Sequence, residues 1–251
     1  MMEHSKNGKD PILSAKGVTK TFEDQPVLRG IDMDLFEGES IVLLGGSGSG
    51  KSVFLGTLIG LITPDAGRIR ILDHVVTDFR KEAEWKELWC NVGFLFQGSA
   101  LFDSMNVRDN IAFPLDVHTD LSRSEIDTKV SRLLSMVGLG EIQEKMPSEL
   151  SGGMQKRVAL ARTIAMEPKI ILYDEPTTGL DPVTSDTIAD LIRELQLRLG
   201  ITSLVVTHDI RLTFKAADRV AMLHEGKILL TVPLEEVQES TDPRVREFLY
   251  G

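Results

Sequence analysis

The sequence of 251 residues has little cysteine, no excess of basic charge and no long apolar run. Cys90 is the only cysteine, so an intrachain disulfide is excluded and a reducing compartment is expected. The formal net charge of −10 leaves no broad basic surface for nucleic acid, so we expect no nucleic-acid partner. No stretch approaches the run of about 18 apolar residues that crosses a membrane. A role at a membrane would therefore need a membrane-spanning partner.

The apolar residues indicate alternating strands and helices. Unbroken apolar runs at 41–44 and 170–173 are typical of strands that are buried on both faces. Alternating apolar residues at 31–35 predict an antiparallel strand, and Ser122 with Glu125 forms a capping box that opens a helix. The sequence therefore predicts the α/β class, with a mostly parallel sheet covered on both faces and an inserted helical stretch in the middle of the chain.

Residues 45–52, GGSGSGKS, match the phosphate-loop pattern G-x-x-x-x-G-K-[ST] at every defined position. Glycines let several N–H groups turn toward phosphate oxygens, and the following helix adds the positive end of its dipole. We expect Lys51 to reach the β- and γ-phosphates of ATP and the Ser52 hydroxyl to ligate Mg²⁺. A chance match would occur in about one chain in a hundred. The nucleotide-binding residues expected here are Gly45, Gly46, Ser47, Gly48, Ser49, Gly50, Lys51, Ser52 and Val53.

Polar residues follow two of the buried runs. We expect Asp174 to hold Mg²⁺, directly or through water, and Glu175 to orient and deprotonate the attacking water. An apolar run followed by Asp-Glu is weak evidence alone, because surface turns often produce it, but it is strong beside a phosphate loop. His208 follows the run at 201–207, and we expect it to contact the γ-phosphate, with Asp209 setting its tautomer. A purely structural histidine is the alternative.

Residues 150–155, LSGGMQ, open a helix with a serine and two glycines, which makes a second anion site. An ordinary serine cap would explain the segment alone. The string resembles the signature motif of the ABC (ATP-binding cassette) ATPases, and the other landmarks of that family follow in the family's order. These are Phe22, similar to the aromatic that stacks on adenine, Gln97, similar to the Q-loop glutamine, Asp181, similar to the D-loop aspartate, and His208, similar to the switch histidine. The resemblance covers nearly the whole chain.

The resemblance implies the ABC ATPase fold as a single domain over 1–251. A P-loop NTPase (RecA-like) core with an antiparallel β subdomain would occupy about residues 10–97 and 156–251, and an inserted α-helical subdomain about 98–155. It also implies a head-to-tail homodimer in which Ser151 and Gly153 of one subunit contact the γ-phosphate of the ATP held by the other. The catalytic residues would then be Glu175, His208 and Gln97, and the Mg²⁺ ligands Ser52, Gln97 and Asp174.

Within the family, the chain looks most like the ATPase of bacterial Mce/Mla-type phospholipid transporters. The residues that carry this likeness include Val53, the segment from Gln97 to Leu115 and the closing residues 242–249. It implies an integral membrane permease as partner, with Mce-domain and STAS-domain proteins, and a peripheral position on the cytoplasmic face of the bacterial inner membrane. Some members carry a tail that joins the two ATPase subunits, and we expect this chain, which stops at Gly251, to lack that contact.

Three alternatives stay open. The chain could be the ATPase of another ABC importer, for example one for amino acids, since the cassette is shared. It could be a soluble ABC ATPase of translation or DNA repair, although such proteins carry two cassettes or a long coiled-coil insertion. It could be a scaffold with an inactive nucleotide site, against which the intact Lys51, Glu175 and His208 argue.

The segment after Gln97 is the expected contact with the membrane partner. Phe102, Phe113 and Leu115 are apolar residues in a stretch with polar flanks, as expected for a groove that receives a short helix from a permease. The alternative is that all three fill the core of the helical insertion. We therefore rest the docking hypothesis on Phe102 and Asp103, which lie next to the loop.

Overall fold

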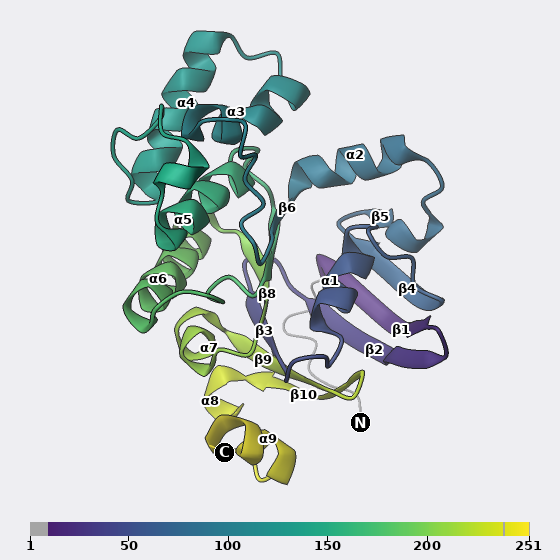
Figure 1. Cartoon of the computed structure of the whole chain (residues 1–251). Coiled ribbons are helices and arrows are strands. Elements are labelled where there is room, and N and C mark those ends of the chain that lie inside the picture. The colour runs from purple at the N-terminus through teal and green to yellow at the C-terminus, as the bar shows by residue number, and fades with distance from the viewer. Residues whose placement is uncertain (1–9, 238, 251) are drawn as a thin grey trace.

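Two β-sheets lie on either side of helix α1 (Lys51–Leu58) in the computed structural model, which describes residues 10–237 and 239–250 (Figure 1). The larger sheet has six strands in the order β10-β9-β3-β8-β7-β6, and the smaller has four in the order β2-β1-β4-β5. The strands are β1 (Leu13–Phe22), β2 (Gln25–Leu35), β3 (Ser40–Leu44), β4 (Ala66–Ile71), β5 (His74–Val75), β6 (Val92–Leu95), β7 (Ile170–Asp174), β8 (Thr202–Thr207), β9 (Arg219–His224) and β10 (Lys227–Pro233). Residues 1–9 of the expected domain lie outside the described residues.

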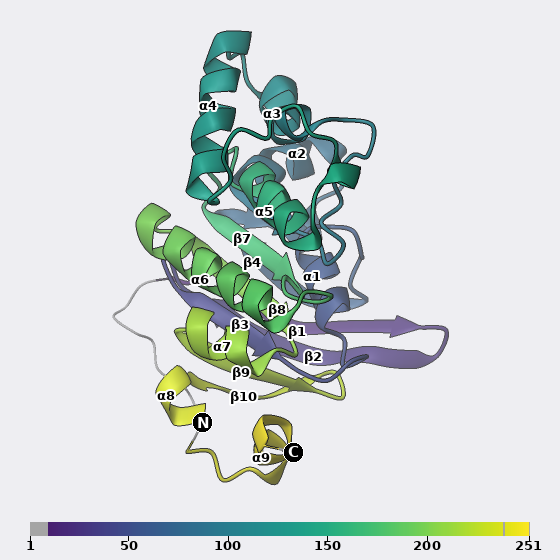
Figure 2. The ribbon, with the colours of Figure 1, turned by 60° about the vertical axis from the view of Figure 1, so that its left-hand side comes forward.

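Helices cover both faces of the larger sheet, as the alternation of strand and helix predicts. The helices that follow α1 in the described residues are α2 (Glu82–Asn91), α3 (Val107–His118), α4 (Arg123–Met136), α5 (Gly152–Thr163), α6 (Pro182–Leu199), α7 (Ile210–Ala216), α8 (Leu234–Val237) and α9 (Pro243–Tyr250), with 3₁₀ turns η1 (Val76–Asp78) and η2 (Pro147–Glu149). Figures 1 and 2 show α6 and α7 on the face of the sheet opposite to α1.

The pairing of the strands confirms both predicted sheet types. Strand β3 pairs in parallel with β8 and β9, and β7 pairs in parallel with β8 and β6. Every pairing in the smaller sheet is antiparallel, and β9 and β10 form an antiparallel hairpin. The parallel strands end at one edge of the sheet, which is where α/β sheets bind ligands.

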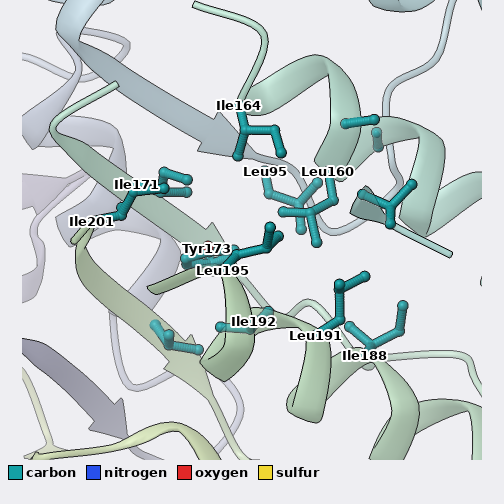
Figure 3. Packing of buried hydrophobic residues seen from close by; sticks show 14 of the residues in the cluster. Leu95, Leu160, Ile164, Ile171, Tyr173, Ile188, Leu191, Ile192, Leu195 and Ile201 are labelled. Atoms are coloured by element: carbon teal, nitrogen blue, oxygen red, sulfur yellow. The ribbon is translucent and has the colours of Figure 1, made fainter. Parts of the chain in front are cut away.

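Strand β7 is buried on both faces because its side chains alternate between two cores. Ile170 and Leu172 pack with α1 and the smaller sheet. Ile171 and Tyr173 point the other way and join Leu95, Leu160 and the buried side of α6, as Figure 3 shows. Each of these four strand residues is at most 1% exposed. A continuous apolar run is therefore the pattern that this position in the sheet requires.

Helices α3 and α4 form the insertion and stand away from both sheets (Figure 2). The predicted capping box of α4 is present, since the backbone N–H of Ser122 donates to Glu125 Oε2 at 2.8 Å. The expected subdomain boundary near residue 155 falls inside α5, which runs without a break to Thr163. Residues 158–161 of this helix are fully buried in the same core as the sheet. Helix α5 therefore belongs to the insertion at its start and to the sheet core at its end.

Candidate functional site

The phosphate loop connects the end of β3 to the start of α1. Gly48 and Gly50 have φ values of +76° and +104°, a region in which residues with a side chain are strained. A Cβ on Gly50 would also lie 3.1 Å from the carbonyl oxygen of Val27. Lys51 is only 6% exposed, and its Nζ donates to the carbonyl oxygens of Gly45 at 2.8 Å and Gly46 at 3.1 Å. The loop therefore forms a narrow turn with a buried cation at its end.

A cavity of about 700 Å³ opens beside this loop. Its lining brings together loop residues and the ends of β6, β7 and β8, and consists of Val27, Gly46, Ser47, Gly48, Gly50, Lys51, Ser52, Val53, Gln97, Glu175, Thr178, His208 and Phe248. Most of the residues expected to bind nucleotide are among them. Gly45 lies behind the loop, where a Cβ would come within 2.5 Å of the Leu223 carbonyl oxygen, and Ser49 Oγ is buried without a hydrogen-bond partner among the described residues.

The carboxylate of Glu175 is the most heavily contacted group in the cavity. Lys51 Nζ lies 3.3 Å from Oε1, and His208 Nδ1 lies 2.9 Å from Oε2. The hydroxyls of Thr178 and Thr207 donate to Oε2 at 3.3 Å and 3.2 Å. Glu175 is 7% exposed and has a φ of +47°, which is uncommon outside glycine and clusters at functional sites. The fold thus holds this carboxylate in one place in the lining of the cavity.

Asp174 and Ser52 form a pair next to Glu175. The hydroxyl of Ser52 donates to Asp174 Oδ1 at 2.8 Å. Burial raises the pKa of Asp174, and the negative charge of Glu175 raises it further, whereas the bond from Ser52 lowers it. A divalent cation placed between these oxygens would favour the ionised carboxylate. Among the described residues no group of three His, Cys, Asp or Glu side chains could hold a metal, so an ion here would need oxygens from a ligand as well.

His208 has a different partner from the one that the sequence predicts. Its Nδ1 faces Glu175, not Asp209. The carboxylate of Asp209 accepts hydrogen bonds from the N–H groups of Arg211 and Leu212 at the start of α7, and from the Thr177 hydroxyl at 2.9 Å. The prediction that Asp209 sets the tautomer of His208 is wrong, because capping of the helix occupies Asp209.

Besides Gly45, Ser49 and Asp174, four expected residues are absent from the lining of this cavity. Ser151 caps α5 and Asp181 caps α6, each by accepting N–H bonds from the first turn of its helix. Gly153 has no room for a side chain, because a Cβ would lie 2.5 Å from Thr184 Cγ2 on α6. Phe22 is 43% exposed at the end of β1, with Lys20 Nζ 5.3 Å from its ring centre. The cavity therefore joins the phosphate loop with Gln97, Glu175 and His208, but not with the residues of the second anion site.

Three cavity residues escape prediction from sequence. Thr178 lies three residues after Glu175, in the turn that follows β7, and its hydroxyl donates to the carboxylate. This short spacing in the sequence is a local pattern from which the contact can be predicted. Val27 on β2 and Phe248 on α9 come from remote parts of the chain. Neither has a local pattern that could place it at the cavity.

Comparisons with known proteins agree with this geometry. The family model described as ABC transporter matches residues 28–178. The probable ribonucleotide transport ATP-binding protein of Mycobacterium leprae is 42% identical over 95% of this chain and 69% of its own length. The chloroplastic protein trigalactosyldiacylglycerol 3 of Arabidopsis thaliana is 37% identical over 98% of this chain and 75% of its own length. The chain belongs to the ATP-binding cassette family.

The solved structures of this family show the same fold. A dimeric ATP-binding cassette bound to ADP and Pi has a TM-score of 0.81 and 32% identity, over 88% of this chain and 98% of its own. Importer subunits also match: a sulfate/thiosulfate import ATP-binding protein of Xylella fastidiosa is 41% identical over 92% of this chain and 66% of its own length. A methionine import ATP-binding protein of Clostridium tetani is 40% identical over 86% of this chain and 68% of its own length.

This ABC protein is thus an ATP-binding and ATP-hydrolysing subunit with the P-loop NTPase fold predicted from its sequence. Across the described ranges, 10–237 and 239–250, no helix has both the length and the apolar character needed to span a bilayer. In the cavity beside the phosphate loop, Lys51 Nζ and Glu175 Oε1 lie 3.3 Å apart.

The replacement Glu175→Gln tests the role of the buried carboxylate. An amide keeps the size of the side chain but cannot accept a proton from water. We expect unchanged ATP binding and a roughly 10²- to 10⁴-fold lower turnover, the usual contribution of a general base. Calorimetry and a phosphate-release assay measure the two quantities. Glu82→Gln, at a side chain that is 74% exposed, is the control. Near wild-type turnover of Glu175→Gln would remove this residue from the role.

Proposed function

We propose that this chain works as one of two identical ATPase subunits of a phospholipid transporter. Two subunits bind an integral membrane permease on the cytoplasmic face of a bacterial inner membrane, and ATP hydrolysis drives lipid movement between membranes. Mce-domain and STAS-domain proteins are further partners in this proposal. The lipid name of the Arabidopsis relative supports it, together with the resemblance of the segment from Gln97 to Leu115 and of residues 242–249 to Mce/Mla-type ATPases.

The residues of the cavity divide the work of hydrolysis. Lys51 exchanges the carbonyl oxygens of Gly45 and Gly46 for phosphate oxygens. Glu175 orients the attacking water and takes its proton, and His208 contacts the γ-phosphate. Ser52, Asp174 and Gln97 are the residues that would hold Mg²⁺, which would supply positive charge to neutralise the phosphates. The hydrogen bond between Ser52 and Asp174 shows that these two side chains already converge.

The second anion site carries the argument for a dimer. Ser151 and Gly153 open α5 with exposed N–H groups, yet neither lines the cavity of its own chain. In a two-fold arrangement of two copies, the same residues can complete the cavity of the partner, and the partner completes the first. Asp181 lies at the neighbouring helix start, linked to α5 through Thr184, which bonds to its carboxylate and touches Gly153. The site of the single chain is therefore half of a shared site.

Phe102 and Phe113 form an exposed aromatic pair beyond the Gln97 loop. Their ring centres are 4.9 Å apart, and the side chains are 40% and 39% exposed. Buried Asn110 holds the backbone of Phe102 in place, accepting from its N–H at 2.8 Å and donating to its carbonyl oxygen at 3.1 Å. Asp103 is exposed beside the pair, whereas Leu115 is fully buried. The docking hypothesis thus keeps Phe102, Asp103 and Phe113, and the assignment of Leu115 to the groove is corrected, because α3 turns that side chain into the core.

Replacing Phe102 and Asp103 together by alanine tests this docking surface. We expect the isolated subunit to bind ATP and to hydrolyse it at the basal rate. Its affinity for the permease should fall by about tenfold or more, and any stimulation by the permease should be lost. Co-purification and ATPase assays with the permease measure these effects. Leu197→Ala is the control, since Leu197 is 66% exposed on α6 and lies outside the aromatic pair. Normal co-purification together with full stimulation would place the docking surface elsewhere. Unfolding of the double variant would show that Phe102 and Asp103 are needed for the stability of the fold.

The transported substrate is tested with the complete transporter in vesicles. We expect ATP-dependent transfer of a fluorescent phospholipid, and ATPase stimulation by phospholipid but not by ribonucleotide, sulfate or methionine. The names of the bacterial relatives make these three solutes the relevant competitors. Stimulation by methionine alone would favour the second candidate, an amino-acid importer. Hydrolysis that responds to no permease and no solute would favour a soluble ABC ATPase without transport.

A further inference from the structure

Side chains of helix α5 form hydrogen bonds with the backbone of the loop that carries Gln97. Lys156 Nζ donates to the carbonyl oxygen of Gln97 in a short hydrogen bond and lies 3.4 Å from that of Phe96. Arg162 donates to the carbonyl oxygen of Ser99 at 2.9 Å, and the Thr163 hydroxyl lies 3.4 Å from that of Phe94. Three side chains of α5 thus contact four backbone carbonyl oxygens between residues 94 and 99. The loop is tied to α5 along its length.

Lys156 is the unusual member of this set. Its side chain is 4% exposed, and among the side chains that the structure describes no carboxylate lies within the 4.0 Å of an ion pair. An ammonium group without a carboxylate partner is costly to bury, so hydrogen bonds to its N–H groups must offset the loss of water. The acceptors that it finds are backbone carbonyls of the Gln97 loop. Burial lowers the pKa of Lys156, and the negative charge of Asp174 opposes that shift.

The loop itself has a conformation that needs outside support. Ser99 and Ala100 have φ values of +62° and +48°, two consecutive non-glycine residues in the left-handed region. Such residues persist only where the surroundings hold them. The carbonyl of Ser99 accepts the bond from Arg162, and the Arg162 guanidinium lies 5.7 Å from the ring centre of Phe102. Arg162 of α5 therefore contacts the loop both at Ser99 and at Phe102.

Lys156 lies on the helix that begins with Ser151 and so connects two different sites. Gln97 lines the cavity of its own chain, whereas Ser151 lies outside that cavity and caps α5. Lys156 lies five positions after Ser151, a rise of about 7.5 Å along the helix. We propose that Lys156 is a positioning residue that couples Gln97 to Ser151, so that ATP in the cavity of one chain sets the position of Ser151 on the ATP of the other. This proposal rests on the shared two-chain site described above.

The replacement Lys156→Met tests the coupling. Methionine keeps the unbranched apolar stem but removes the ammonium and its hydrogen bonds. In the wild type, two ATP molecules bound by one dimer are expected to give a Hill coefficient approaching about two. We expect Lys156→Met to lower that coefficient toward about one and the maximal rate by about tenfold to a hundredfold, with unchanged ATP affinity. Lys156→Arg restores both, because the guanidinium can reach the same carbonyls.

A double-mutant cycle separates coupling from a merely structural role. If Lys156 acts through Gln97, the replacement Lys156→Met has little further effect on the maximal rate in a Gln97→Ala background. Effects that multiply, or a wild-type Hill coefficient in Lys156→Met, overturn the proposal. Lys129→Met is the matched control, since its ammonium pairs with Glu167 at the surface of the insertion at 2.9 Å. If Lys156→Met does not fold, the same double-mutant cycle is measured with Lys156→Gln, because glutamine keeps an N–H donor without the charge.

A separate experiment tests whether two chains form the shared site, independently of the role of Lys156. Sedimentation of the hydrolysis-deficient Glu175→Gln chain with ATP reports whether two chains associate at all. A chain that stays monomeric contradicts the shared site and the coupling with it. A chain that dimerises, with Lys156→Met kinetics identical to the wild type, contradicts the role of Lys156 alone.

Discussion

The contact of Glu175 with Lys51 and His208 is the interaction on which the site depends. It joins three segments that are far apart in the sequence, at 3.3 Å and 2.9 Å from the two carboxylate oxygens. The contact exists because β3, β7 and β8 are neighbours in one sheet and parallel, so that the loops after them meet at one edge. Packing on both faces fixes the register of these strands, since a shift by one residue would exchange their two buried faces.

The residues of this edge are predictable because each follows a buried apolar run or a glycine pattern. That logic finds the phosphate loop, Asp174, Glu175 and His208, and it finds both sheet types. It fails where the contacts of a side chain depend on the tertiary structure and not on its neighbours in the sequence. Asp209 caps α7 instead of orienting His208, and Leu115 turns into the core although its neighbours suggest a groove. Phe248 reaches the cavity from the last helix, a contact that no local pattern contains.

Helix α5 relates the nucleotide edge to the rest of the molecule. It starts after its cap Ser151, which does not line the cavity of its own chain, and it ends in the core of the sheet. Between these ends it holds the Gln97 loop through Lys156 and Arg162. The same loop continues to the exposed pair of Phe102 and Phe113. One helix thus contacts both the segment that lines the cavity and the segment that we propose faces the membrane partner, which is an arrangement that can relay a change at one site to the other.

In the dimer that we propose, residues from two chains hydrolyse each ATP. Mixing a Lys51→Ala chain with a Ser151→Arg chain tests it most directly, because neither variant alone can form an intact site. A mixed dimer contains one intact site, so random pairing predicts recovery of up to about a quarter of wild-type hydrolysis. No recovery, with mixed dimers confirmed by mass spectrometry, would contradict the shared site.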